Sequence, residues 1–233
     1  AQEEAAGGLK ELLKDPMMKA QIRRELMTHM EGHQREEGWE DELILSVDSE
    51  EDKDLIGKTV AEAAKMRNKE PIDFAIDSMA EGKGINGISF VIGEEDLIAV
   101  TKYPFSMISS DSSATNTTMK RGSHPRIYGT FPRLLRIYVR EQGVLTWEEA
   151  IHKITGLPAS RLGLWDRGAI RPGNWADIAV FDPIKIRDNA TYQDPVQYSE
   201  GIQYLTVNGV LTIDEGRHTG ATAGKPLIHK SSA

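Results

Sequence analysis

Short apolar runs alternate with helical segments through the first half of this chain, and this alternation constrains its fold more than any other feature. The apolar runs cover residues 41–47, 85–93 and 105–111, and each has the length of a buried strand. The pattern is typical of a doubly wound sheet or an α/β barrel. In both folds catalytic residues lie at the carboxyl ends of strands. Asp111 ends the third run, so it is either a catalytic carboxylate or an ordinary turn or capping aspartate.

Local signals predict where several helices begin. Asp15 and Pro16 place a capping residue and a first-turn proline before an amphipathic segment, and Pro71 opens another helix. Thr146 and Glu149 have the spacing of a capping box. The residues expected to face the core on the intervening helices are Val60, Ala63, Ala64, Met66, Phe74, Ala75 and Met79.

The character of the sequence changes after about residue 165, where glycine-rich turns surround short β runs. The Asn-Gly pair within residues 207–210 is a strong hairpin signal. We therefore expect a domain boundary between residues 160 and 168, with an α/β part over residues 1–163 and a small all-β part over residues 164–233.

Composition excludes several classes of protein. The net charge is −8 with acidic residues spread along the chain, which argues against a nucleic-acid-binding face. No apolar run approaches the roughly 18 residues of a membrane span, and the first residues do not resemble a signal peptide. The chain has no cysteine, which is compatible with a reducing compartment. We expect a cytoplasmic protein with no nucleic-acid or membrane partner.

Two neighbouring side chains, His124 and Arg126, flank a proline and precede a predicted helix. Arginine is suited to a two-pronged grip on a carboxylate, although a structural ion pair is the alternative. His124 could orient a partner or bind a metal, but a lone histidine is more often structural. His29 and His33 are four residues apart, yet their polar, glycine-containing context argues against a shared ligand face. The sequence has no H-x-H, H-E-x-x-H or G-x-S-x-G motif, so spacing alone completes neither a metallohydrolase nor a Ser-His-Asp site.

Several longer motifs carry a family resemblance. They are "GGLKELLKDPMMKAQIRREL" (7–26), "HPRIYGTFPR" (124–133), "DRGAIRPGNWADIAVFDP" (166–183), "DPVQYSEGIQYLTVNGV" (194–210) and "GRHTGATAGKPL" (216–227). Over about residues 7 to 227 the chain resembles the carboxyl-terminal part of the N-acyl-D-amino-acid deacylases, or D-aminoacylases, of the metal-dependent amidohydrolase superfamily. The "GNWADIAVFDP" motif is similar in many amidohydrolases, whereas "HPRIYGTFPR" narrows the resemblance to the deacylases.

The resemblance implies a fold and a reaction. The fold is the second half of a (β/α)8 TIM-type barrel over residues 1–163, followed by part of a small β-sandwich over residues 164–233. The reaction is zinc-dependent hydrolysis of an N-acyl-D-amino acid to a carboxylate and a free D-amino acid, with one or two zinc ions. Most zinc ligands are expected outside this chain, in the missing amino-terminal half of the barrel, which could be a separate chain.

The resemblance also implies roles for individual residues. Asp111 corresponds to the aspartate that closes the eighth barrel strand, where it binds metal and passes a proton from metal-bound water to the leaving amine. Arg126 corresponds to the arginine that holds the substrate α-carboxylate, Ser46 to a hydroxyl that helps hold it, and His124 to a residue of the pocket wall. Many relatives carry a glycine beside the aspartate where this chain has "SSDSS", which leaves the acyl preference and the metal count open.

Two other readings remain open from the sequence. The first is a different amidohydrolase, acting on a dipeptide, a cyclic amide or a hydantoin-like ring. The second is a non-catalytic partner subunit that keeps the fold without the chemistry.

Overall fold

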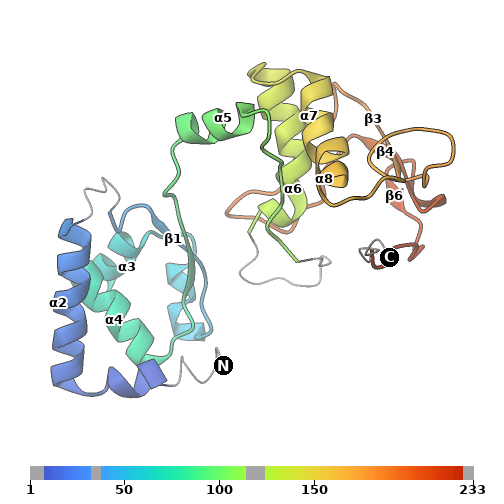
Figure 1. Ribbon diagram of the computed structural model, residues 1–233. Coiled ribbons are helices and arrows are strands. Elements are labelled where there is room, and N and C mark those ends of the chain that lie inside the picture. The colour runs from blue at the N-terminus through green and yellow to red at the C-terminus, as the bar shows by residue number, and fades with distance from the viewer. Residues whose placement is uncertain (1–7, 33–37, 114–123, 228–233) are drawn as a thin grey trace, which may run out of the picture. The chain divides into compact units, whose positions relative to one another are not determined.

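The computed structural model of the protein describes residues 8–32, 38–113 and 124–227. These residues form two compact units, of which the first ends at Ile92 and the second begins at Gly93 (Figure 1). The side chain of His29 and all of His33 lie outside the described residues. None of the helices in the described ranges is both long enough and apolar enough to cross a membrane.

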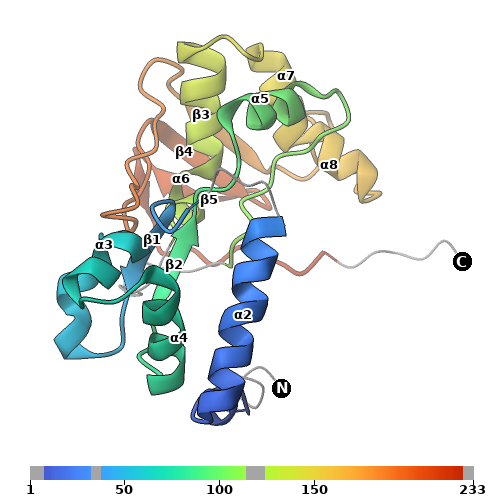
Figure 2. The ribbon, with the colours of Figure 1, turned by 90° about the vertical axis from the view of Figure 1, so that its left-hand side faces the viewer.

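The first unit is mainly helical. Its elements are helical residues 8–12, α2 (Pro16–Gly32), the 3₁₀ helix η1 (Glu50–Leu55), α3 (Val60–Met66) and α4 (Pro71–Glu81). The Asp15 carboxylate accepts a 2.8 Å hydrogen bond from the amide of Met17, which confirms the predicted start of α2. Helices α2 and α4 lie side by side (Figures 1 and 2), and Asp77 of α4 binds both Lys19 and Lys69.

Two strands in this unit, β1 (Glu42–Ser46) and β2 (Asn86–Ser89), form a small sheet. They confirm that the first two predicted runs contain strands. The strands are antiparallel, with Leu43 opposite Ile88, whereas the strands of an α/β barrel are all parallel. The described residues therefore do not show the predicted half-barrel, because neither strand has a parallel neighbour to extend the sheet.

The core of the first unit forms between these strands and helices. Its buried members are Ile44, Val47, Leu55, Ala63, Ala64 and Phe74. Ala63, Ala64 and Phe74 confirm the predicted inward faces of α3 and α4. The prediction for Met66 and Met79 is wrong: both side chains are exposed, and both residues lie in the last turns of their helices.

The second unit contains a helical layer. It consists of α5 (Glu94–Lys102), α6 (Arg126–Arg133), the π-helix η2 (Leu134–Glu141), α7 (Trp147–Ile154) and α8 (Gly156–Arg161). The predicted capping box is confirmed at the start of α7. The Glu149 amide donates to Thr146 Oγ1 at 3.2 Å, and the Thr146 amide donates to Glu149 Oε2 at 2.8 Å.

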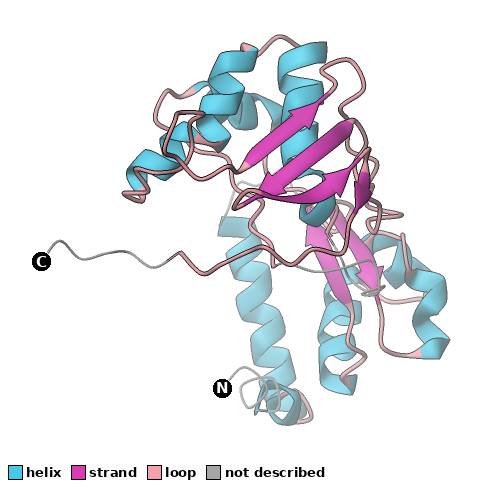
Figure 3. Cartoon of the chain, turned by 90° about the vertical axis from the view of Figure 1, so that its right-hand side faces the viewer, coloured by secondary structure: helices cyan, strands magenta, loops and turns pink. Residues whose placement is uncertain are grey.

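A four-stranded antiparallel sheet follows the helices in the same unit. Its strands are β3 (Ile178–Phe181), β4 (Ile202–Val207), β5 (Val210–Asp214) and β6 (Arg217–His218), in that spatial order. Figure 3 shows the strands of the chain in magenta. Asn208 and Gly209 have φ values of 51° and 81°, the positive values that an Asn-Gly turn requires, which confirms the predicted hairpin. In the described part of this unit there is one sheet, so the sandwich is not shown.

The helices pack on one face of this sheet. The buried cluster contains Leu134, Leu135, Tyr138, Val139, Leu145, Ala150 and Ile186, with Phe181 and Ile202 of the sheet packed against it. The predicted boundary at residues 163–164 lies inside this second unit. That boundary stays a prediction.

One charged side chain is expected to matter for stability in the first unit. The carboxylate of Asp52 is only 4% exposed and binds Arg67 at 3.1 Å and Lys83 at 3.3 Å. Aspartate is almost never fully buried unless it is paired, and these two cations provide the pairing. Asp52→Asn should lower the free energy of unfolding by about 1–3 kcal/mol, because it weakens buried hydrogen bonds between charged groups.

Asp54→Asn is the matched control, measured by urea denaturation alongside Asp52→Asn. Asp54 binds the same Arg67 at 2.7 Å, but its side chain is 48% exposed. Solvent screens an exposed pair, so its loss should be clearly smaller. Equal losses for the two variants would contradict the importance of burial at Asp52.

Candidate active site

The helix that begins at Arg126 is held in place by a contact that its own sequence requires. Pro132 lies inside α6 and has no N–H, so it cannot donate to the carbonyl oxygen of Tyr128 one turn earlier. The hydroxyl of Ser199 donates to that oxygen instead, at 2.8 Å. The contact ties the first half of α6 to the irregular chain between β3 and β4.

Asp188, in that irregular chain, makes a second attachment. Its carboxylate is almost fully buried and binds Arg136 Nε at 2.8 Å and Arg133 Nη1 at 3.4 Å. The hydrogen bond to Asp188 raises the pKa of Arg136 further above its ordinary value. A Cβ on Gly129 would lie 3.0 Å from the Asp188 Cβ, so glycine allows this close approach. Two guanidinium partners compensate the burial of one carboxylate.

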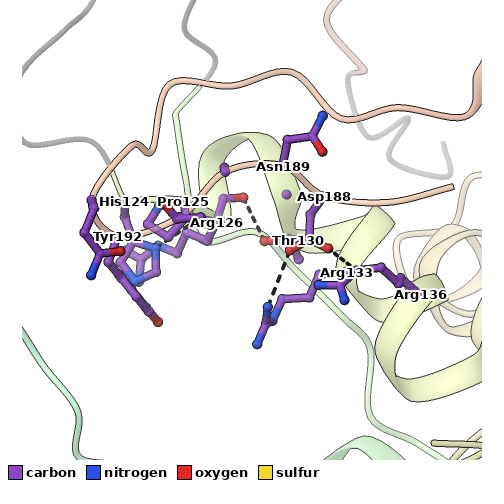
Figure 4. Close-up of a pocket in the computed structure, with 13 residues that line it drawn as sticks. His124, Pro125, Arg126, Thr130, Arg133, Arg136, Asp188, Asn189 and Tyr192 are labelled. Atoms are coloured by element: carbon purple, nitrogen blue, oxygen red, sulfur yellow. Dashed lines mark hydrogen bonds and ion pairs between the residues drawn. The ribbon is translucent and has the colours of Figure 1, made fainter. Parts of the chain in front are cut away.

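A cavity of ≈ 370 Å³ opens between α6 and the chain around Asp188. Figure 4 shows His124, Arg126 and Tyr192 together in one part of its wall and the ion pairs of Asp188 in another. Among the described lining residues the charged ones are Arg126, Arg133, Arg136 and Asp188. Arg126 also pairs with Asp111 and Arg136 with Glu141, but guanidinium groups have more donors than these carboxylates use, so the lining can receive an anionic group.

Asp111 reaches this wall through an ion pair. Its Oδ2 lies 3.1 Å from Arg126 Nη2, and the two side chains are 85% and 44% exposed, respectively. Residues 106–113 form no strand, so the prediction that Asp111 ends a strand is wrong; no described strand pairs with this segment. Asp111 has a φ of 45°, and its amide donates to Ser109 Oγ at 3.3 Å. Exposed pairs of this kind add little stability. What this pair shows is that the Asp111 carboxylate lies beside the Arg126 guanidinium.

His124 is oriented by its neighbours in the same wall. Its Nδ1 accepts a 3.0 Å hydrogen bond from the Arg126 amide, and its ring packs edge-on against Tyr192 with centroids 5.6 Å apart. Burial, and next the charge of Arg126, lower the pKa of His124, while the charge of Asp111 acts in the opposite direction. A neutral imidazole that accepts at Nδ1 carries its proton on Nε2, so His124 can offer one N–H donor.

Ser46 lies in the other compact unit, at the end of β1. Its buried hydroxyl accepts a 3.4 Å hydrogen bond from Asn86 Nδ2. The structure thus brings together Asp111, Arg126 and His124, while the role predicted for Ser46 stays a prediction.

The residues that the structure describes do not form a complete zinc site by themselves. In the described ranges, no group of three or more histidine, cysteine, aspartate or glutamate side chains could hold a metal ion. Asp111 is chemically suited to bind a metal, but the charged group that it contacts is the guanidinium of Arg126. Its predicted role as a ligand therefore requires donors from outside these residues.

Residues that the sequence reasoning missed form much of the pocket wall. Among them are Arg133 and Arg136, which follow the predicted Arg126 at intervals of seven and three residues and so share one face of a helix with it. That spacing could have indicated a basic wall. Asp188 and Tyr192 come from a distant irregular segment and carry no comparable signal.

The sequence of this chain matches a family model and several known proteins. A model of the amidohydrolase family matches residues 19–213. The D-aminoacylase of Alcaligenes xylosoxydans xylosoxydans is 36% identical over 77% of this chain and 35% of its own length. The N-acyl-D-aspartate deacylase of the same organism is 41% identical over 58% of this chain and 26% of its own. A dihydroorotase of Lactobacillus acidophilus is 35% identical over 31% of this chain and 16% of its own.

Solved structures that are similar to this chain also belong to deacylases. A D-aminoacylase superposes with a TM-score of 0.67 and 34% identity, covering 78% of this chain and 36% of its own. The N-acyl-D-glutamate deacylase of Bordetella bronchiseptica, complexed with zinc and a phosphonate inhibitor, superposes with a TM-score of 0.63 and 31% identity. The match covers 77% of this chain and 36% of the deacylase. This chain thus spans about a third of the length of the D-aminoacylases and of the N-acyl-D-glutamate deacylase, and less of the other two relatives. Since the family model matches most of its residues and solved D-aminoacylases share its fold, the chain belongs to the amidohydrolase family.

Proposed function

We propose that this chain is the carboxyl-terminal part of a metal-dependent hydrolase that cleaves N-acyl-D-amino acids to a carboxylate and a free D-amino acid. The observation that carries the proposal is the 3.1 Å pair of Asp111 and Arg126 beside an arginine-lined cavity. The names of the related deacylases support the substrate class.

Arg126 is proposed to hold the α-carboxylate of the substrate. Its guanidinium is partly exposed and uses Nη2 toward Asp111, while the planar fork has donors enough for a second carboxylate. His124, neutral and with an N–H on Nε2, lies in the same wall and can donate to a substrate oxygen.

Asp111 is proposed to carry the proton. In an N-acyl amino acid the α-carboxylate and the amide nitrogen are attached to the same carbon, so a carboxylate held by Arg126 brings the amide nitrogen near Asp111. Asp111 takes a proton from the attacking water and delivers it to the nitrogen as the C–N bond breaks and the water oxygen joins the acyl carbon. Zinc, held with ligands from outside these residues, would polarise the amide carbonyl and acidify the water.

A hydrolase of cyclic amides is the second candidate, favoured by the similarity to a dihydroorotase. That match covers less than a third of this chain, whereas the D-aminoacylase match covers most of it. The deacylase function is therefore the better supported of the two.

Replacing Arg126 tests the recognition of the α-carboxylate. Arg126→Ala should raise KM for N-acyl-D-amino acids about 10- to 100-fold, because a charge-assisted, two-pronged hydrogen bond is lost. The same substitution should leave turnover of the corresponding N-acyl-D-amino amide, which lacks the carboxylate, nearly unchanged. Steady-state kinetics on both substrates measure this, with the exposed Arg161→Ala on α8 as control. Equal losses on both substrates would contradict the role.

Replacing Asp111 tests proton transfer. Asp111→Asn should lower kcat about 10²-fold or more while circular dichroism and melting temperature stay unchanged, because an acid–base group is removed from an exposed position. Glu148→Gln, an exposed acidic residue at the start of α7, is the control for loss of one charge. Undiminished turnover in Asp111→Asn would refute the proposed mechanism. It would also favour the alternative that this chain is a non-catalytic partner subunit.

The charge of Arg126 should also be detectable at His124. Arg126→Gln should raise the pKa of His124 relative to the unaltered protein, because a neighbouring cation that disfavours the imidazolium form is removed. An NMR pH titration of the His124 ring measures this shift. Arg161→Gln, on α8, should leave the pKa of His124 unchanged. A pKa shift of the same size in that variant would show that the effect of Arg126 is not local.

A further inference from the structure

Lys153 is a buried lysine whose partners are unusual. It lies in the last turn of α7 and is only 4% exposed, although lysines are seldom buried without a partner. Its Nζ donates to the carbonyl oxygen of Tyr103, to that of Ser106 at 3.3 Å and to the Ser106 hydroxyl at 3.1 Å. An ammonium group has three donors, and here three neutral oxygens receive them.

These oxygens belong to the segment that leads directly to Asp111. The segment follows α5 and, from residue 106 on, has neither helix nor strand, so no ladder of backbone hydrogen bonds fixes it. A second link comes from the backbone of Lys153, whose carbonyl oxygen accepts from the Ile108 amide at 3.4 Å. The Ile108 side chain packs against the buried cluster that includes Ala150 of α7.

Only Ser109 and Ser110 separate this anchored segment from Asp111. A peptide chain spans at most about 3.6 Å per residue, so the Cα of Asp111 lies within about 11 Å of the Cα of Ile108. At the other end, Asp111 meets Arg126, which the helix α6 positions independently. The distance between the two side chains therefore depends on the attachment at Lys153.

We propose that Lys153 is a positioning residue for the reaction: through the segment of residues 103–108 it sets where the Asp111 carboxylate lies relative to Arg126. This inference rests on the proposed role of Asp111 as the proton carrier. In a strand-borne site the ladder supplies such rigidity; here the buried ammonium group of Lys153 supplies it together with the attachment of Ile108. The last turn of α7 also suits the charge, because a helix C-terminus favours a cation.

A double-mutant cycle in the active enzyme tests the proposal. Lys153→Met removes the ammonium group with little change in volume and should lower kcat about 10-fold or more, since a small displacement of a catalytic group is costly. KM should change less than about 3-fold, because Arg126 keeps its place. In an Asp111→Asn background, Lys153→Met should have no further effect on kcat. Multiplicative losses would show that Lys153 acts independently of Asp111 and would overturn the proposal.

Two further variants separate positioning from general stability. Val139→Ala removes buried volume from the same cluster and should lower the melting temperature without changing kcat per folded enzyme. A fall in kcat as large as that of Lys153→Met would overturn the proposal. Lys153→Arg, which keeps a cationic donor, should recover a substantial part of kcat; a variant as slow as Lys153→Met would count against donation by the side chain.

Hydrogen exchange gives a readout that does not require activity. Lys153→Met should increase amide exchange about 10-fold in peptides covering residues 103–111, relative to the peptides of α6. If the unaltered enzyme cleaves no N-acyl-D-amino acid, the proposed function fails, and exchange alone then decides whether Lys153 anchors the segment. Unchanged exchange in residues 103–111 would overturn the anchor itself.

Discussion

The placement of Arg126 depends on the buried carboxylate of Asp188. Burying a charge is costly unless ion pairs or hydrogen bonds compensate it, and Asp188 is paired with both Arg133 and Arg136. These two arginines lie along the continuous helical stretch of α6 and η2, so fixing them fixes the helix. Arg126 is the first residue of that stretch. The backbone position of Arg126 therefore depends on ion pairs that lie about two to three turns away along the helix.

Asp111 reaches the same place by a separate route. Its segment is attached to α7 through Lys153, and no part of α6 contributes to that attachment. The two side chains then meet in an exposed pair that contributes little stability. The geometry of the site consequently comes from buried contacts around it and not from the strength of the pair itself, which leaves both side chains available to a substrate.

The sequence was informative where a feature depends on neighbours in the chain. The Asp15 cap, the box of Thr146 and Glu149 and the turn at Asn208 each involve residues at most three positions apart, and all three are confirmed. The apolar run before Asp111 predicted a strand, but a strand also requires a partner, and none is described there. Likewise Asp188 and Lys153 act across about 50 positions, a separation at which sequence spacing carries no signal. Asp111 and Arg126 could be named from family motifs, whereas their supports could not.

The shared use of Arg126 has a consequence for the proposed reaction. A substrate carboxylate and the Asp111 carboxylate are like charges, and bringing them together is unfavourable unless a cation lies between them. The guanidinium fork can donate to both, so the arginine that recognises the substrate also makes its approach to Asp111 tolerable. A molecule without an α-carboxylate would not engage this fork, and its amide would not be directed toward the proton carrier. In the proposed reaction, selection for the amino-acid portion of the substrate and proton delivery to its nitrogen would thus depend on the same side chain.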